Sequence, residues 1–246
     1  MPVSYNPYLV IVSAFIAVFA SYTALDLAGR VTTARGAERQ FWLVVGATAM
    51  GTGIWSMHFL AMLAFSLPVS IGYNFFLTII SLLAAILASA VALSIVSRPR
   101  VSFSVLVNSA VAMGIGVGLM HYIGMAAMQM AANIHYNPIL FLLSVVVAVV
   151  VSLVALKLSL QFRDQKAGRI PQIISAIVMG AGIVTLHYTG MAAATFKADP
   201  ERYIETSGLN RNSMAFLIAS FTFLILSTTV VIATDKAEDK KFLSKG

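Results

Sequence analysis

Three of the four histidines in this chain lie in the same local sequence. The segments AMGTGIWSMHFLAM (49–62), AMGIGVGLMHYIGM (112–125) and VMGAGIVTLHYTGM (178–191) contain His58, His121 and His187. Each histidine is followed four residues later by a methionine, and these are Met62, Met125 and Met191. Because residues i and i+4 share one face of a helix, each segment presents an imidazole and a thioether together. Three such pairs in register predict one converging site.

Copper is the metal that this set of side chains favours. Imidazole and thioether suit copper, Cu(I) above all and also Cu(II), whereas Mg, Ca and Mn prefer oxygen, and none of the three segments contains an acid. Zinc could be held by three histidines and a water, but the methionines would then have no purpose. Haem iron takes one or two axial ligands, which three equivalent histidines fit poorly. Zinc and haem are therefore the weaker alternatives.

Other methionines recur around the same histidines. Met57 and Met120 directly precede their histidines and are further candidate ligands, although Leu186 occupies this position in the third copy and argues against an obligatory ligand there. A deeper set lies eight residues before the histidines, about 12 Å away at about 1.5 Å per residue. We interpret this set as core, with a second site or a conduit as the alternative: Met50, Met113 and Met179.

The elements that carry these residues are predicted to be membrane-spanning helices. The 246 residues are 59% hydrophobic and 10% charged, with a mean hydropathy of +0.91, whereas soluble domains carry about 25% charge. This composition excludes an ordinary water-soluble enzyme and a disordered chain, and the lack of cysteine excludes disulfides and thiolate metal sites. Apolar runs of about 20 residues predict an all-α bundle of seven spans near 7–29, 41–66, 74–96, 103–129, 138–161, 171–195 and 213–234.

Basic residues predict the orientation of these spans. All but three of the 16 Lys and Arg residues fall at one end of the predicted helices, and the exceptions are Lys197, Arg202 and Arg211. Basic loops stay in the cytoplasm, so we expect the N-terminus outside and the C-terminus inside. The net charge of +7 then reflects membrane topology, and we expect no direct nucleic-acid partner.

The spans form a repeated two-helix unit. The odd spans open with SYNPYL (4–9), GYNFFL (72–77) and IHYNPIL (134–140), and the seventh opens more loosely with LNRNSM (209–214). Asn is a favourable N-cap and Pro suits the first helical position, so Asn6-Pro7 and Asn137-Pro138 predict helix starts. We expect three repeats of an odd and an even helix, closed by a seventh helix. Small residues allow close helix packing, which accounts for Gly51, Gly114 and Gly180.

The even helices should bring the histidines to one depth. Each histidine lies about 17 residues past the cytoplasmic end of its helix, or about 26 Å along the axis. This depth is near the outer boundary of a hydrocarbon core about 30 Å thick. An imidazole inside a bilayer is costly and usually functional, which strengthens the prediction of a shared site.

The hexapeptides MHFLAM, MHYIGM and LHYTGM, one in each repeat, resemble the signature of the MHYT domain family. The resemblance covers about residues 7–234, although the tetrapeptide itself is never intact: the first copy lacks Tyr and Thr, and the third lacks the leading Met. It implies a sensory domain of the bacterial inner membrane that binds copper through Met and His near the outer face. It also implies sensing of a diatomic gas (O2, CO or NO) and fusion to cytoplasmic GGDEF, EAL or DNA-binding outputs.

We therefore expect a non-catalytic sensor domain at 1–234 and a cytoplasmic tail at 235–246 that leads to an output module. The sensed ligand would be copper or a gas bound to copper, and the seventh helix would carry the signal. The expected partners are membrane lipid, a fused or associated output of the GGDEF/EAL or regulatory type, and a second copy of the chain in a homodimer. A copper transporter and a haem protein are the alternative functions.

Overall fold

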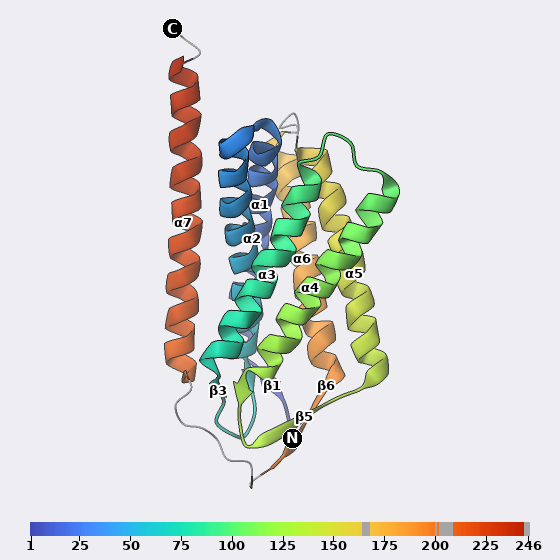
Figure 1. Cartoon of the computed structure of the whole chain (residues 1–246). Helices are drawn as coiled ribbons and strands as arrows, with labels where there is room; N and C mark the ends of the chain where they lie inside the picture. The colour runs from blue at the N-terminus through green and yellow to red at the C-terminus, as the bar shows by residue number, and fades with distance from the viewer. Residues whose placement is uncertain (164–167, 200, 202–208, 244–246) are drawn as a thin grey trace.

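Seven helices make up most of the chain in the computed structural model, which describes residues 1–163, 168–199, 201 and 209–243 (Figure 1). They are α1 Pro7–Thr33, α2 Gly36–Ala64, α3 Phe75–Val96, α4 Phe103–Ala126, α5 Pro138–Phe162, α6 Arg169–Ala193 and α7 Arg211–Leu243. Each contains a segment long and apolar enough to cross a membrane. The predicted all-α, seven-span class is confirmed, and the chain is a multi-pass membrane protein.

The helix ends differ from the prediction at two places. The first two spans were predicted near 7–29 and 41–66, but α1 continues to Thr33 and α2 begins at Gly36. Gly36 has a φ of 55°, a left-handed conformation that glycine adopts without strain, so one tight turn suffices. Charge was a misleading sign of a loop here, because Arg30 pairs with Asp26 one turn earlier on the same helix at 3.0 Å. The seventh helix also runs beyond 234, to Leu243.

Six of the helices form a ring, and α7 lies outside it. Consecutive helices from α1 to α6 pack side by side, and α6 packs against α1 to close the ring. The seventh helix packs chiefly along α2 (Figure 1). Its buried side chains recur every four residues and form one stripe: Met214, Ile218, Thr222 and Leu226. The last helix therefore completes the set of spans without taking part in the closure of the ring.

The repeated glycines are points of closest helix approach, as predicted. A Cβ on Gly51 of α2 would lie 2.6 Å from the backbone of Ile86 in α3. The equivalent distance for Gly114 is 2.8 Å, to the backbone of Val149 in α5, and Gly180 meets the backbone of α1 in the same way. Each even helix thus touches the odd helix of the next repeat, which extends the sequence repeat into a three-fold arrangement of helix contacts.

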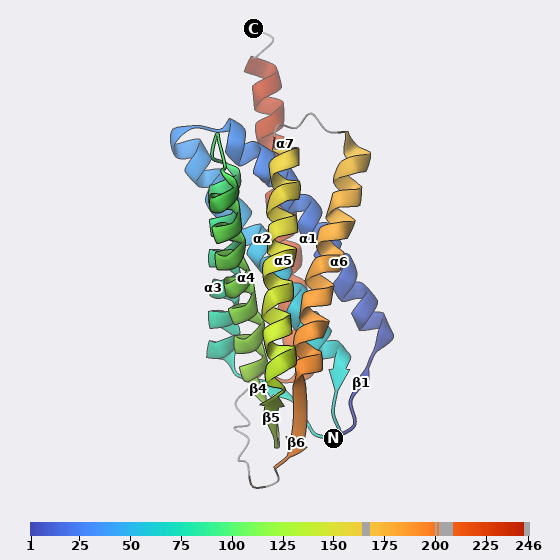
Figure 2. The same ribbon diagram turned by 90° about the vertical axis from the view of Figure 1, so that its right-hand side faces the viewer.

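Three small β-ladders, which the sequence did not reveal, lie at the end of the bundle that carries the N-terminus (Figures 1 and 2). In every repeat a strand before the odd helix pairs with a strand after the even helix. The pairs are β1 (Ser4–Tyr5) with β2 (Phe65–Ser66), β3 (Gly72–Tyr73) with β4 (Met128–Gln129), and β5 (Ala132–Tyr136) with β6 (Ala194–Ala198). The ladders tie together the ends of the helices that carry the histidines.

Asparagine sets the start of each odd helix at this end. The side chain of Asn6 accepts hydrogen bonds from two backbone N–H groups of α1, and Asn137 does the same at α5. Asn74 caps α3 through the N–H of Leu77 at 3.0 Å. The backbone N–H of each Asn donates to the end of the even helix, for example from Asn6 to Ala64 at 2.8 Å. The predicted helix starts are confirmed.

Candidate metal centre

The imidazoles of His58, His121 and His187 meet at the centre of the bundle. Each comes from a different even helix, and each is at most 1% exposed. The Nδ1 atom of His58 lies 3.1 Å from that of His187 and 3.2 Å from that of His121. One ligand atom from each of the three residues falls within 4.8 Å of the other two. The predicted convergence at one depth is confirmed.

The planes of the three imidazole rings are steeply inclined to one another. Their centroids lie 4.9 to 5.3 Å apart, with interplanar angles of 71° to 81°. Each ring also stands edge-on, at 85°, to the aromatic ring that follows it in the sequence. Those neighbours are Phe59, Tyr122 and Tyr188. Aromatic packing therefore restrains the plane of each imidazole.

Glycine on the next helix holds two of the rings in place. The Nε2 side of His58 rests against Gly124 of α4, and that of His121 rests against Gly190 of α6, so closely that a Cβ could not fit. Both glycines lie three residues after the histidine of their own helix, and Ala61 takes this position in α2. These two rings are thus oriented by packing against the backbone of a neighbouring helix. The sequence of one repeat alone does not show this contact, because it joins two repeats.

Hydrogen bonds among the three imidazoles do not satisfy the hydrogen-bonding capacity of all their nitrogens. A neutral imidazole carries one N–H, so each Nδ1···Nδ1 contact needs one proton and leaves other lone pairs pointing inward. The three Nε2 atoms are buried and have no hydrogen-bond partner within the part of the chain that the structure describes. A buried polar atom without a partner costs about 1–3 kcal/mol. A cation between the imidazoles would be bound by the Nδ1 lone pairs of the neutral rings, whose protons would then lie on Nε2.

The spacing of the nitrogens fits a metal ion of the zinc or copper size. With an N–metal bond of about 2.0 Å, two nitrogens of one ion lie roughly 3.3 Å apart in tetrahedral geometry and 3.5 Å in trigonal geometry. The observed distances of 3.1 and 3.2 Å are close to these values. Axial ligands of haem would instead lie about 4 Å apart on opposite faces of a macrocycle, and rings in mutual contact leave no space for one.

The methionines predicted as ligands are all buried in the bundle. Met62 and Met125 are 0% exposed, Met191 is 4% exposed, and Met57 and Met120 are 1% exposed. Met57 belongs to a small apolar cluster with Ala17 of α1 and Ala61, whereas the other four belong to the main core cluster. Coordination by these sulfurs stays a prediction, and the histidines alone form the geometric site.

An open pocket lies at the strand-bearing end of the bundle. It measures about 330 Å³, and its lining includes Met62, Tyr73 and Arg211. Burial raises the pKa of Tyr73, partly offset by Arg211, so this phenol stays neutral. The guanidinium of Arg211 donates to the carbonyl of Leu63 and, at 3.2 Å, to the hydroxyl of Ser66. One of its lining residues, Met62, lies one helical turn after His58 on α2.

Serines on the odd helices support the centre and were missed in the sequence. Ser13, Ser81 and Ser144 each lie seven residues after the capping Asn of their helix and are at most 4% exposed. Ser81 donates to the carbonyl of Met120 at 2.9 Å, next to His121. Ser144 and Tyr122 share a hydrogen bond at 2.6 Å. The repeated spacing from Asn to Ser was the signal that could have revealed them.

Comparison with protein families identifies relatives over most of the chain. The model of the MHYT family, described as a bacterial signalling protein N-terminal repeat, matches residues 1–39, 51–108 and 114–169. The matched residues include His58 and His121, whereas His187 lies beyond them. No solved structure matches the chain.

Three curated relatives are signalling proteins. The bifunctional diguanylate cyclase/cyclic di-GMP phosphodiesterase MucR of Pseudomonas aeruginosa is 44% identical over 94% of this chain and 34% of its own length. The signaling protein YkoW of Bacillus subtilis is 35% identical over 99% of this chain and 30% of its own. The cyclic di-GMP phosphodiesterase NbdA of Pseudomonas aeruginosa is 38% identical over 77% of this chain and 24% of its own length. The chain thus spans about a third or less of the length of these relatives.

Proposed function

Because the chain belongs to the MHYT family of bacterial signalling proteins, we propose that this membrane sensory domain binds copper at His58, His121 and His187. The observation that carries the proposal is the convergence of three buried imidazoles, with one ligand nitrogen from each within 4.8 Å of the other two. Zinc would fit the nitrogens equally well. The thioethers of Met62, Met125 and Met191, one helical turn from the histidines, favour copper. Met57 and Met120 are the further candidate ligands.

The sensed stimulus in this proposal is copper itself or a diatomic gas, O2, CO or NO, that reaches the metal. Bound copper would supply a coordination position for such a gas. The chain's own residues hold the three imidazoles, orient them through Gly124 and Gly190, and exclude bulk water by burial. The pocket lined in part by Met62 offers an approach from the strand-bearing end.

The seventh helix is the proposed route to the output. The hydroxyl of Ser56, two residues before His58, hydrogen bonds to that of Thr222 on α7, and both side chains are buried. A change in the position of α2 is therefore transmitted to α7, whose helix continues to Leu243. With the basic end of the bundle in the cytoplasm, α7 leaves the inner membrane towards the cytoplasm, and residues 235–246 form the link to the output.

The proposed output is a cytoplasmic GGDEF/EAL-type or regulatory module. The names of two relatives, MucR and NbdA, describe cyclic di-GMP enzymes, and the chain matches only part of their length. In this proposal the membrane region senses and does not catalyse. Lipid surrounds its outward side chains, such as Phe15, Phe76 and Leu142, which are 63% to 75% exposed.

Metal analysis of the purified protein tests the copper site. We expect the triple variant His58→Ala/His121→Ala/His187→Ala to bind one copper ion fewer per chain than the wild type. The matched control is His135→Ala, because His135 is exposed in β5 and its loss should leave the copper content unchanged. Equal copper content in the triple variant and the wild type would overturn the assignment. An infrared band of CO bound to the reduced protein, absent from the triple variant, would support gas binding.

A further inference from the structure

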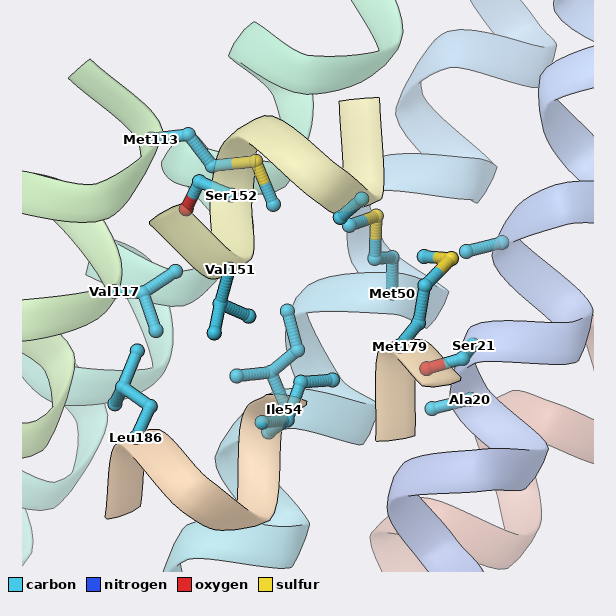
Figure 3. A pocket seen from close by; sticks show the side chains of 13 residues that line it. Ala20, Ser21, Met50, Ile54, Met113, Val117, Val151, Ser152, Met179 and Leu186 are labelled. Atoms are coloured by element: carbon cyan, nitrogen blue, oxygen red, sulfur yellow. The ribbon is translucent and has the colours of Figure 1, made fainter. Parts of the chain in front are cut away.

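A second set of side chains from equivalent positions in the three repeats meets inside the bundle, farther from the strand-bearing end than the histidines. Met50, Met113 and Met179 come from α2, α4 and α6 and are 3% to 6% exposed. All three line one internal cavity of about 30 Å³. Figure 3 shows the three side chains extending from three different helices into the same space. They lie eight residues before the histidines, about 12 Å along each helix axis.

Two serine hydroxyls also line this cavity. Apart from the three methionines and these serines, the lining residues are Ala, Ile, Val and Leu. Ser21 of α1 and Ser152 of α5 each lie 15 residues after the capping Asn of their helix, so they too occupy equivalent positions in the repeat. Ser21 donates its hydroxyl proton to the carbonyl of Ala17 at 2.8 Å, which leaves its oxygen able to accept. No acid, histidine or basic residue is among the lining residues.

Ordinary core packing does not account well for this arrangement. Methionine is the flexible residue that fills irregular gaps, and protein cores hold few voids as large as a water molecule. Here three methionines surround a space and leave it open. A water in that space would find only two hydroxyls, near the lower limit of the two to four polar partners that a buried water needs. The chemistry that three thioethers share is affinity for a soft metal ion.

We propose that Met50, Met113 and Met179 form a second metal site, which binds one soft monovalent cation of the Cu(I) or Ag(I) type. A single charge keeps the cost of burial below that of a divalent ion, and thioethers exclude the hard cations of the cell. The hydroxyl oxygens of Ser21 and Ser152 face the same space. This site goes beyond the proposed sensor function and does not depend on metal binding by the histidines.

Silver titration of the whole chain in detergent tests the site, because Ag(I) is a soft monovalent ion without redox chemistry. The variant Met50→Leu/Met113→Leu/Met179→Leu removes the sulfurs at nearly constant volume. The control variant Met128→Leu/Met130→Leu/Met214→Leu changes three other buried methionines. We expect the first variant to bind one Ag(I) fewer than the wild type, and the control to bind the same number as the wild type.

X-ray absorption at the silver edge identifies the ligands of the lost ion. In His58→Ala/His121→Ala/His187→Ala we expect the deep ion to persist with sulfur neighbours, so failure of the histidine site and failure of this site are distinguishable. Unchanged silver stoichiometry in the deep triple variant would overturn the proposal, as would an equal loss in the control. If the deep triple variant does not fold, each single Met→Leu variant should weaken silver binding at least tenfold, and three silent single variants would also overturn it.

Discussion

Replacing Gly124 with alanine should weaken metal binding, because Gly124 is the surface on which the His58 ring rests. The added Cβ would lie less than 3.0 Å from both Nε2 and Cδ2 of His58. Atoms in contact normally stay about 3.5 Å apart, so the imidazole must retreat by up to about 1 Å. Metal sites tolerate deviations of only about 0.2 Å in a ligand distance, so the displaced Nδ1 can no longer share an ion with the other two.

The expected effect is a large loss of copper affinity. Removing the groups that orient a metal ligand typically costs about 10- to 100-fold in affinity, and we expect Gly124→Ala to fall in that range. The assay is competition for Cu(I) between the purified protein and a chromogenic chelator. Gly190→Ala should have a similar effect through His121, whose Nε2 side it would crowd in the same way.

Gly118→Ala provides the matched control on the same helix. No atom lies within 4 Å of a Cβ built at Gly118, so its affinity should equal that of the wild type. Equal Cu(I) affinities for Gly124→Ala and Gly118→Ala, with both proteins fully helical by circular dichroism, would refute the reasoning. That result would mean that α4 does not fix the position of the His58 ring.

Three further predictions concern the fold and the coupling to α7. Gly51→Ala should lower the free energy of unfolding by about 1–3 kcal/mol, since its Cβ would lie 2.6 Å from the backbone of α3; an unchanged midpoint of unfolding by SDS would contradict this. Asn137→Ala removes the side-chain cap of α5 and should cost about 1 kcal/mol in the same assay. Ser56→Ala removes the hydrogen bond to Thr222. It should leave Cu(I) affinity unchanged but reduce any copper-induced change in hydrogen exchange along α7, and an undiminished change would exclude this route.

The parts of the fold that follow from periodic chemistry could be predicted from the sequence. Apolar runs of membrane length predicted the seven helices, and Asn before Pro predicted the helix starts at Asn6 and Asn137. Repetition of the His segments predicted that His58, His121 and His187 would meet. Each of these inferences depends on residues close together in sequence or on a comparison of equivalent positions, which sequence alone supplies.

The features that sequence analysis did not predict depend on contacts between repeats. The β-ladders contain as few as two residues per strand, too few to show an alternating pattern. The contact of Gly124 with His58 joins two repeats, and Gly124 is indistinguishable in sequence from a glycine used for helix packing. The closure of the ring by α6 on α1 and the place of α7 on α2 depend on which helices pack together, and hydropathy does not encode that choice.

In the proposed sensor, the position of α7 would make the output of a three-fold site asymmetric. The candidate metal centre draws one imidazole from each repeat, so a change in coordination would act on α2, α4 and α6 alike. The seventh helix packs chiefly along α2, and Ser56, which bonds to it, lies two residues before His58. A displacement of α2 would therefore reach α7 directly, while one of α4 or α6 would first have to pass through the ring. Variants of His58 should consequently disturb signalling more than variants of His121 or His187 that lower copper affinity by the same factor.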